Sequence, residues 1–406
     1  MNAGHLIDIT NKHLNHLCNT IKTRRLGKQG NRDATVYFHQ QIQQFGFKTE
    51  QQRFHCIDSC LGLSTLTVDG NAFNIFASPF TQACVLTAQL VAASTLGGLE
   101  SIDCKDKILL LHGDIAREQL MPKGFEFYNP EEHQKIYQLL ERKEPAAILT
   151  ATSKNPDAVG AIYPFPMIED GDFNIPSAFL KDMEGLRLLP FMTKQASLTI
   201  DAARVPSSGE NIVARKGNPN RKLVICAHID TKENTPGALD NASGVTIMLL
   251  LGHLLVDYQG DLGVELVALN GEEYYNTPGQ VKYLRNYQND FSSILLAINM
   301  DDIGYINGRT AFSFYGVPES VMNGIRSVYA GKDGFFEGPS WYQSDHGIFM
   351  AKGIPAMAIT EENVLELMAE ITHTEKDVPA IIDPNKLVQN ARTLKSVIAA
   401  LDQLLQ

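Results

Sequence analysis

The chain of 406 residues is 44% hydrophobic and carries 46 acidic against 35 basic side chains, a formal charge of −11. This composition excludes an intrinsically disordered chain and a small scaffold that needs disulfides or a metal to fold. The negative charge argues against a nucleic-acid partner, because the tightest basic cluster near the start, Lys22, Arg24 and Arg25, is too small to bind a polyanion. At about 150 residues per domain, the length predicts two or three domains.

The opening residues predict neither export nor membrane insertion. Residues 1–9 have no apolar core behind basic side chains, and no apolar run approaches the roughly 18 residues that a membrane span needs. Six scattered cysteines without paired spacing are typical of reduced thiols: Cys18, Cys56, Cys60, Cys84, Cys104 and Cys226. We therefore expect a cytoplasmic protein with no membrane partner. A metal site at His55, Cys56 and Cys60 is disfavoured, because no second ligand pair follows.

Two helices are predicted at the start of the chain. The first follows apolar and histidine positions at helical spacing from Leu6 to Ile21, and the second covers 33–45 and stops at Gly46. From 63 to 203 the pattern changes to short apolar strands separated by turn residues, with one polar helix over 131–142. The strands are expected at 83–88, 107–111 and 146–150. This part predicts a separate, strand-rich inserted domain.

After residue 206, strands and helices alternate, which predicts an α/β domain with a mixed, mainly parallel sheet flanked by helices. Continuous apolar runs, as expected for strands covered on both faces, lie at 222–227, 263–269, 293–298 and 356–359. A final helix should begin with Asp383 as N-cap and Pro384 as its first residue. Its apolar positions are Leu387, Ala391, Leu394, Ile398, Leu401 and Leu405. This domain would comprise 1–62 and 204–406.

Side chains able to bind a metal follow these strands. They form four clusters, His228-Ile-Asp230, Asp240-Asn241, Glu272-Glu273 and Asp301-Asp302, with His373 in a later polar loop. Loops at the carboxyl ends of parallel strands converge at one edge of the sheet, which is where such folds place their sites. Two imidazoles with three carboxylates form a ligand set that zinc accepts without a thiolate. Asp230 is positioned to accept the second imidazole N–H of His228.

The segment 241–256 is apolar nearly all round and is expected to form a helix buried behind the site. Its N-terminus then points at the carboxylate of Asp240, where the helix dipole favours negative charge. His253 lies three turns along this helix, too far for a ligand at 1.5 Å per residue, and is interpreted as structural. His112, which follows a strand of the inserted domain, is interpreted in the same way.

The ordered motifs of the second half resemble the co-catalytic zinc aminopeptidases of metallopeptidase family twenty-eight, clan MH. The motifs that carry the resemblance are Ala227-His-Ile-Asp230, Pro236-Gly-Ala-Leu-Asp-Asn-Ala-Ser-Gly244, Glu272-Glu273, Asn299-Met-Asp301, Ser344-Asp-His346 and His373-Thr. The resemblance spans 206–406, with the two N-terminal helices as the family's lead-in, and implies the zinc exopeptidase fold. The insert at 63–203 is similar to a protease-associated domain.

The resemblance also implies an activity and a role for each residue. Asp240 would bridge two zinc ions, with His228 and Asp301 completing one coordination sphere and Glu273 and His373 the other. Glu272 would act as the general base for hydrolysis at the N-terminal residue of peptides with a free amino end. Cobalt or manganese can share these ligands, so the sequence leaves the metal open, together with homo-oligomerisation.

The chain departs from the family after the glutamate pair. Most relatives continue there with a small residue, Gly and Leu, then Gly-Ser, whereas this chain has Tyr274-Tyr-Asn-Thr-Pro-Gly279. The preferred N-terminal residue therefore cannot be transferred from relatives. Asp302, Asp345 and His346 receive no role. Three alternatives stay open: a single-metal enzyme of the glutaminyl cyclase type, a carboxypeptidase-like enzyme, and an inactive binding protein on the same scaffold.

Overall fold

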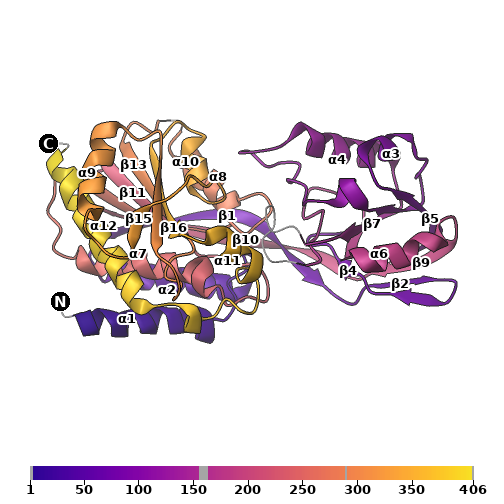
Figure 1. The fold of residues 1–406 in the computed structure, drawn as a ribbon, viewed down its shortest axis with the longest axis horizontal. Coiled ribbons are helices and arrows are strands. Elements are labelled where there is room, and N and C mark those ends of the chain that lie inside the picture. The colour runs from indigo at the N-terminus through magenta and orange to yellow at the C-terminus, as the bar shows by residue number, and fades with distance from the viewer. Residues whose placement is uncertain (1–2, 155–162, 289, 405–406) are drawn as a thin grey trace. The chain divides into compact units, whose positions relative to one another are not determined.

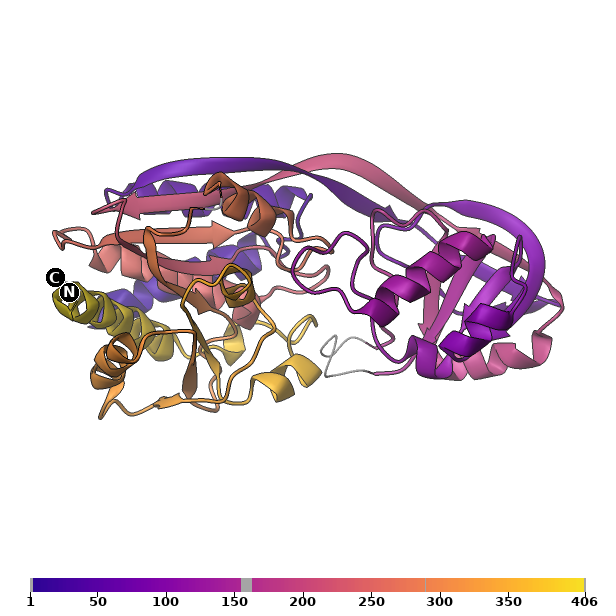
Figure 2. The ribbon, with the colours of Figure 1, turned by 90° about the horizontal axis from the view of Figure 1, so that it is seen from above.

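A computed structural model describes residues 3–154, 163–288 and 290–404. The chain divides into two compact units (Figure 1). Unit 1 comprises Met1–Cys56, Ser208–Leu367 and Ile371–Gln406, and unit 2 comprises Ile57–Ser207 and Met368–Glu370. Two long strands, β1 (Lys48–Leu61) and β10 (Ala202–Lys216), pair with each other and cross the boundary in sequence, as the adjacent long ribbons in Figure 2 show. No helix in the described part of the chain has the length and apolarity to cross a membrane.

Unit 1 is built on an eight-stranded mixed sheet in the order β1-β10-β12-β11-β13-β16-β14-β15. The four predicted strands lie next to one another in parallel: β12 (Gly263–Leu269), β11 (Lys222–His228), β13 (Ile294–Met300) and β16 (Ala356–Glu361). The outer strands β14 (Thr310–Tyr315) and β15 (Phe335–Glu337) follow at one edge. All residues of β11 and β12 are buried, which explains their continuous apolar runs. The predicted α/β class is confirmed.

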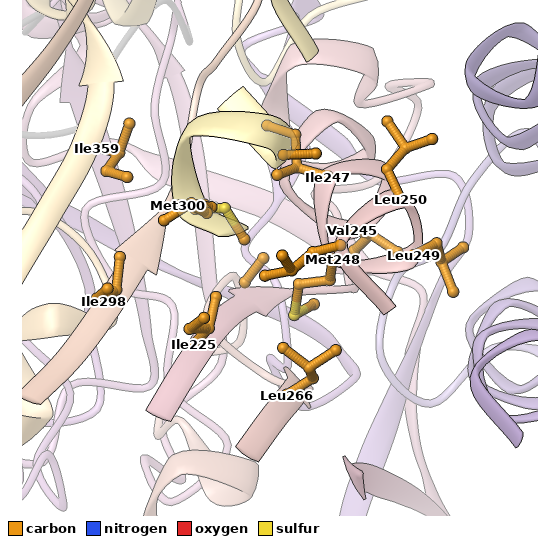
Figure 3. Close-up of a cluster of buried hydrophobic side chains, with 14 of the residues drawn as sticks. Ile225, Val245, Ile247, Met248, Leu249, Leu250, Leu266, Ile298, Met300 and Ile359 are labelled. Atoms are coloured by element: carbon orange, nitrogen blue, oxygen red, sulfur yellow. The ribbon is translucent and has the colours of Figure 1, made fainter. Parts of the chain in front are cut away.

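Helix α7 (Ser243–Leu254) is buried along most of its length against the middle of this sheet. Figure 3 shows Val245 and Met248 of α7 beside Ile225 of β11 and Leu266 of β12. Helices α1 (Ala3–Asn15), α2 (Gln29–Gln43) and α12 (Pro384–Leu404) contact α7 as well, so α7 is enclosed by sheet and helices. This position explains why its sequence is apolar nearly all round. The helix begins two residues later than predicted because the backbone of Asp240 and Asn241, in the irregular turn η4 (Ala238–Ala242), is not helical.

Further helices pack on α7, on one another or on the sheet. The two predicted N-terminal helices are present as α1 (Ala3–Asn15), extended by the turn η1 (His16–Thr20), and α2 (Gln29–Gln43). Helix α12 (Pro384–Leu404) begins as predicted, with Asp383 Oδ1 accepting the Asn385 N–H at 2.9 Å; Leu405 lies outside the described residues. The others are α8 (Pro278–Asn286), α9 (Glu319–Tyr329), α10 (His346–Met350), α11 (Val364–Glu370) and the turn η5 (Pro379–Ile381).

Unit 2 has its own eight-stranded sheet in the order β3-β2-β9-β5-β6-β7-β8-β4. The three predicted strands occur as β5 (Cys84–Ala93), β6 (Ile108–Leu111) and β7 (Ala147–Thr152). Strand β5 runs five residues past its predicted end because Leu90–Ala93 pair with β6. The others are β2 (Thr65–Val68), β3 (Asn71–Phe73), β4 (Phe76–Ala77), β8 (Ser177–Lys181) and β9 (Gln195–Ile200).

Helices accompany the sheet of unit 2. The predicted polar helix is α4 (Glu131–Lys143), which buries Ile136, Tyr137 and Leu140 on one face and exposes its charged side chains on the other. The shorter elements are α3 (Leu96–Ser101), the turn η2 (Gly113–Ala116), α6 (Asp182–Leu188) and the turn η3 (Leu189–Phe191). Unit 2 therefore contains its own hydrophobic core and is strand-rich but not purely β.

Candidate metal centre

Three adjacent strands of unit 1 bring the predicted ligands to one edge of the sheet. Strand β11 lies between β12 and β13 and runs parallel to both. His228 is the last residue of β11, Asp301 directly follows β13, and Glu272 and Glu273 follow β12 after a two-residue turn. Asp240 lies in η4, immediately before the buried helix α7. The sheet therefore gathers side chains that are far apart in the sequence.

The five predicted metal ligands form two groups that share Asp240. In the first group, His228 Nε2 lies 3.1 Å from Asp240 Oδ1 and 3.3 Å from Asp301 Oδ1. In the second, His373 Nε2 lies 3.0 Å from both Asp240 Oδ2 and Glu273 Oε1. Within each group the candidate ligand atoms all lie within 4.8 Å of one another. Each group thus offers one imidazole nitrogen and two carboxylate oxygens to a single point.

The unsatisfied atoms of these residues fit a divalent cation. His228 Nε2, Asp301 Oδ1 and Glu273 Oε1 are buried and have no hydrogen-bond partner among the described residues. Burying a polar atom without a partner costs free energy, so several such atoms in one place indicate a site where a cation binds. Carboxylate oxygen and imidazole nitrogen are a ligand set for zinc and its neighbours in the first transition series. The donor chemistry therefore matches two metal positions bridged by Asp240.

The pKa values around the centre reflect its crowded carboxylates. Burial opposes a charge on His228 and His373, but Asp301, Asp240 and Glu273 outweigh it and hold both imidazole pKa values well above their usual range. Burial likewise opposes the charge of Asp240, yet the two imidazole nitrogens at 3.1 and 3.0 Å hold its pKa well below the usual range. The two imidazoles thus supply the positive charge that metal cations would supply beside these carboxylates.

Glu272 lies beside both groups but belongs to neither. Its carboxylate is close enough to interact electrostatically with His228 and Glu273, and with Asp345 and Asp301. Burial raises the pKa of Glu272 well above its usual range, and the nearby carboxylates of Glu273 and Asp345 add to this rise. A carboxyl group with a raised pKa, next to a metal-type cluster and outside the ligand set, is suited to accept and return a proton.

Asp230 has a different contact from the one predicted. The Nδ1 of His228 donates to the main-chain oxygen of Asp230 at 3.1 Å, whereas the Asp230 carboxylate is 3.8 Å away. That carboxylate instead accepts the backbone N–H groups of Gly271, Glu272 and Glu273 at 2.8, 3.3 and 3.1 Å. Three backbone donors satisfy a buried carboxylate better than one imidazole does. Asp230 therefore fixes the loop that carries the glutamate pair.

Two further side chains form hydrogen bonds that hold the candidate ligands in place. Ser344 Oγ donates to Asp301 Oδ2 at 2.6 Å and itself accepts from Asn299 Nδ2 at 2.8 Å. Asp377 accepts the backbone N–H groups of Leu239 and Asp240, at 2.6 and 3.1 Å. The sequence analysis assigned no role to Asn299 or Asp377. Asp377 follows His373 by four residues in the same polar loop, and this closeness in sequence could have indicated its position near the centre.

The side chains left without a role lie outside the two groups. Asp345 Oδ1 accepts from Gln280 Nε2 at 2.8 Å, and His346 Nε2 donates to the Trp341 carbonyl at 2.7 Å. Asp302 is buried next to Asp301 without joining either group. His253 packs edge-on against Phe45, with ring centroids 5.0 Å apart, as expected for a structural residue. None of the six cysteines joins a metal-type group in the described ranges.

The basic cluster near the start of the chain has an internal role. Arg24 is fully buried and donates to the main-chain oxygens of Ile229, Pro236 and Gly237 at 2.9, 2.7 and 2.8 Å. These carbonyls belong to the loop between His228 and Asp240, so the guanidinium holds together the segment that carries two predicted ligands. Sequence reasoning missed this contact because its partners lie more than 200 residues away.

Comparison with known proteins gives one family and several relatives. Residues 211–398 match the model of peptidase family M28. A protein described as "Probable leucine aminopeptidase 2" from Aspergillus fumigatus is 23% identical over 363 residues, which are 82% of this chain and 67% of that protein. An aminopeptidase from Pseudomonas aeruginosa is 31% identical over 144 residues, and this match covers only 26% of that protein.

Solved structures extend the likeness to nearly the whole chain. The aminopeptidase from Aneurinibacillus sp. strain AM-1 superposes with a TM-score of 0.77 at 20% identity, over 97% of this chain and 93% of that one. BSAP, a zinc aminopeptidase from Bacillus subtilis, superposes with a TM-score of 0.73 at 20% identity, over 97% and 94%. At these identities the comparisons show a shared fold.

Proposed function

The chain belongs to peptidase family M28 through residues 211–398, and on this premise we propose that it is a zinc-dependent aminopeptidase that removes the N-terminal residue of peptides. The observation that carries the proposal is the pair of metal-type groups that share Asp240 at the carboxyl edge of the sheet. Relatives named as aminopeptidases, one of them as a zinc enzyme, support the same activity.

The proposed centre holds two zinc ions. His228, Asp240 and Asp301 hold one ion, and Asp240, Glu273 and His373 hold the other. When bound, such a pair supplies a nucleophilic water at neutral pH and stabilises the negative charge that develops on the scissile carbonyl. Asp230 and Ser344 keep the ligand loops in place, through the N–H groups of the glutamate loop and through Asp301.

Glu272 performs the proton transfers in this proposal. Its carboxylate accepts a proton from the attacking water and returns it to the departing amine, so one residue serves as base and then as acid. The hydrogen bond from the Glu272 N–H to Asp230 holds its backbone beside the ligands. The acidic residues around the centre also suit a substrate that presents an ammonium group, which favours cleavage at a free amino end.

The proposal is tested by metal content together with cleavage of paired peptides. The full chain is loaded with zinc, its metal content is measured, and release of the N-terminal residue is followed from one peptide with a free and one with an acetylated amino end. Two ions per chain with cleavage of the free peptide alone support the proposal. Binding of two ions without any release of N-terminal residues would contradict it.

The same assay separates the alternatives. One ion per chain with ring closure of an N-terminal glutamine supports the glutaminyl cyclase type, and release of C-terminal residues supports a carboxypeptidase-like enzyme. A chain that binds no metal and turns over no peptide is a binding protein. Each of the three enzymatic outcomes has its own product, so a mixture of activities would also be recognised.

A further inference from the structure

A lysine that the proposed mechanism does not use lies against one of the two metal-type groups. Lys232 Nζ donates to the main-chain oxygen of Glu273 at 2.8 Å and lies 3.7 Å from Glu273 Oε2. The Lys232 side chain is 22% exposed, while the Glu273 side chain is buried. Since Glu273 is a proposed ligand, the ammonium group of Lys232 lies next to the position where a cation would bind.

The two oxygens of Glu273 face different partners. Oε1 lies 3.0 Å from His373 Nε2, within the second group, and Oε2 faces the ammonium of Lys232. Lys232 thus leaves one oxygen for a metal and draws negative charge toward the other. In addition, the hydrogen bond from Lys232 to the Glu273 carbonyl restrains the ammonium group next to the Glu273 side chain.

The first group has no comparable neighbour in the described part of the chain. Asp301 Oδ2 accepts from the neutral hydroxyl of Ser344, and the ion pairs of Asp301 and His228 are formed within the centre. The two positions share Asp240 and each adds one imidazole and one carboxylate, so their ligand sets are chemically equal. In nearby charge, the two positions therefore differ by the ammonium of Lys232 beside Glu273.

We propose that Lys232 makes the two metal positions unequal, by weakening cation binding at Glu273 and His373 relative to binding at His228 and Asp301. This inference rests on the proposed two-metal function and adds a determinant to it. The ion beside Lys232 is then the exchangeable one, and the occupancy of that position follows the supply of free metal. Charges at about 4–6 Å change proton affinities by tenfold or more, and we expect an effect of that size on metal binding.

Zinc titration of the metal-free full chain tests this proposal, with free zinc set by a competing chromogenic chelator. Lys232→Met removes both the charge and the hydrogen bond, whereas Lys232→Gln removes the charge and keeps a donor. Lys352→Met, at an exposed lysine, serves as the matched control. We expect both Lys232 variants to tighten the weaker of the two dissociation constants about tenfold, with the tighter constant and the control unchanged.

Three results would overturn the proposal. If the weaker of the two dissociation constants stays within twofold of its wild-type value in both variants, the charge of Lys232 has no role in metal binding. If Lys232→Met binds zinc more weakly than the wild type and Lys232→Gln binds it with wild-type affinity, Lys232 acts only through its hydrogen bond to the backbone. A wild-type chain that binds no zinc overturns this inference and the proposed function together, whereas two bound ions with unchanged constants overturn only the inference.

Discussion

Glu272 is the residue on which the proposed chemistry depends, since it lies beside both ligand groups without belonging to either. Replacement by glutamine keeps the shape and removes the carboxylate that accepts the proton. We expect Glu272→Gln to bind two zinc ions with unchanged affinity and to lose a factor of about 10²–10⁴ in kcat, the usual contribution of a general base. Metal analysis and steady-state kinetics on the same preparation measure both quantities.

The exposed Glu132 of α4 provides a control for Glu272→Gln. Glu132→Gln makes the same chemical change in unit 2 and should leave kcat and metal content unchanged. Full activity of Glu272→Gln with two bound ions would show that the proton is taken by another group. Loss of metal from that variant would instead make Glu272 a ligand.

His13 of α1 makes stability depend on pH. Burial lowers its pKa to about 4, with Lys12 adding to the effect, and its Nδ1 lies 2.7 Å from the Tyr37 hydroxyl. The unfolded chain, with a pKa near 6.5, binds the proton more tightly, so this residue destabilises the fold as the pH falls from about 6.5 to about 4. The loss amounts to about 3 kcal/mol at the acid end.

Denaturant unfolding at several pH values measures this effect. We expect the free energy of unfolding of the wild type, minus that of His13→Gln, to fall as the pH is lowered from 7 to 4, because only the wild type carries the buried imidazole. A difference that stays constant over this range would show that His13 accepts its proton in the folded state.

At the scale of elements, the N-terminal segment belongs to the site although it lies outside the residues that match the family. Arg24, between η1 and α2, binds three carbonyls of the loop from His228 to Asp240. Asn31 of α2 donates to Asn270, the residue after β12, at 2.7 Å. The segment thus joins the loops that follow two neighbouring strands, and it positions ligands that it does not itself supply.

Removing the Arg24 guanidinium tests this positioning role. Arg24→Met leaves several buried carbonyls without a donor, at a cost of about 1–3 kcal/mol for each such group, and we expect a loss of about 3 kcal/mol in unfolding free energy. We also expect weaker zinc binding, because the loop from His228 to Asp240 loses its anchor. Arg392→Met, on the exposed face of α12, is the control. Unchanged stability and zinc affinity would refute the role.

The elements that sequence reasoning predicted well are those whose pattern is local. Strands β11, β12, β13 and β16 are continuous apolar runs because both faces of the sheet are covered, and polar residues directly after such runs marked the ligand loops. Strands β8 and β9 were not predicted, since each is short and partly exposed and depends on pairing with distant segments.

Contacts between distant segments explain what the sequence could not predict in the site. Lys232 and Arg24 are ordinary basic residues in the sequence, and their roles arise from partners that the fold brings to them. Asp230 was expected to face its close neighbour His228, but the turn after β12 offers it three backbone donors. A local pattern therefore identifies the candidate ligands, while the residues that orient them depend on tertiary structure.

At the scale of the whole molecule, all proposed ligands lie in unit 1, whereas unit 2 has separate hydrophobic cores. A ligand that binds only the folded state stabilises it, by about 4 kcal/mol at a thousand times its dissociation constant. We expect chelation to lower the melting temperature of unit 1 and to leave that of unit 2 unchanged, measured by calorimetry. Asp240→Asn, which lacks the shared ligand, should show no response to chelation.

The proposed chemistry depends on two metal ions held at one edge of the sheet of unit 1. Anomalous diffraction at the zinc absorption edge, from crystals of the zinc-loaded chain, tests this most directly because it locates the ions themselves. We predict two peaks that share Asp240, one next to His228 and Asp301 and the other next to Glu273 and His373. A single peak, or two peaks away from these side chains, would contradict the account.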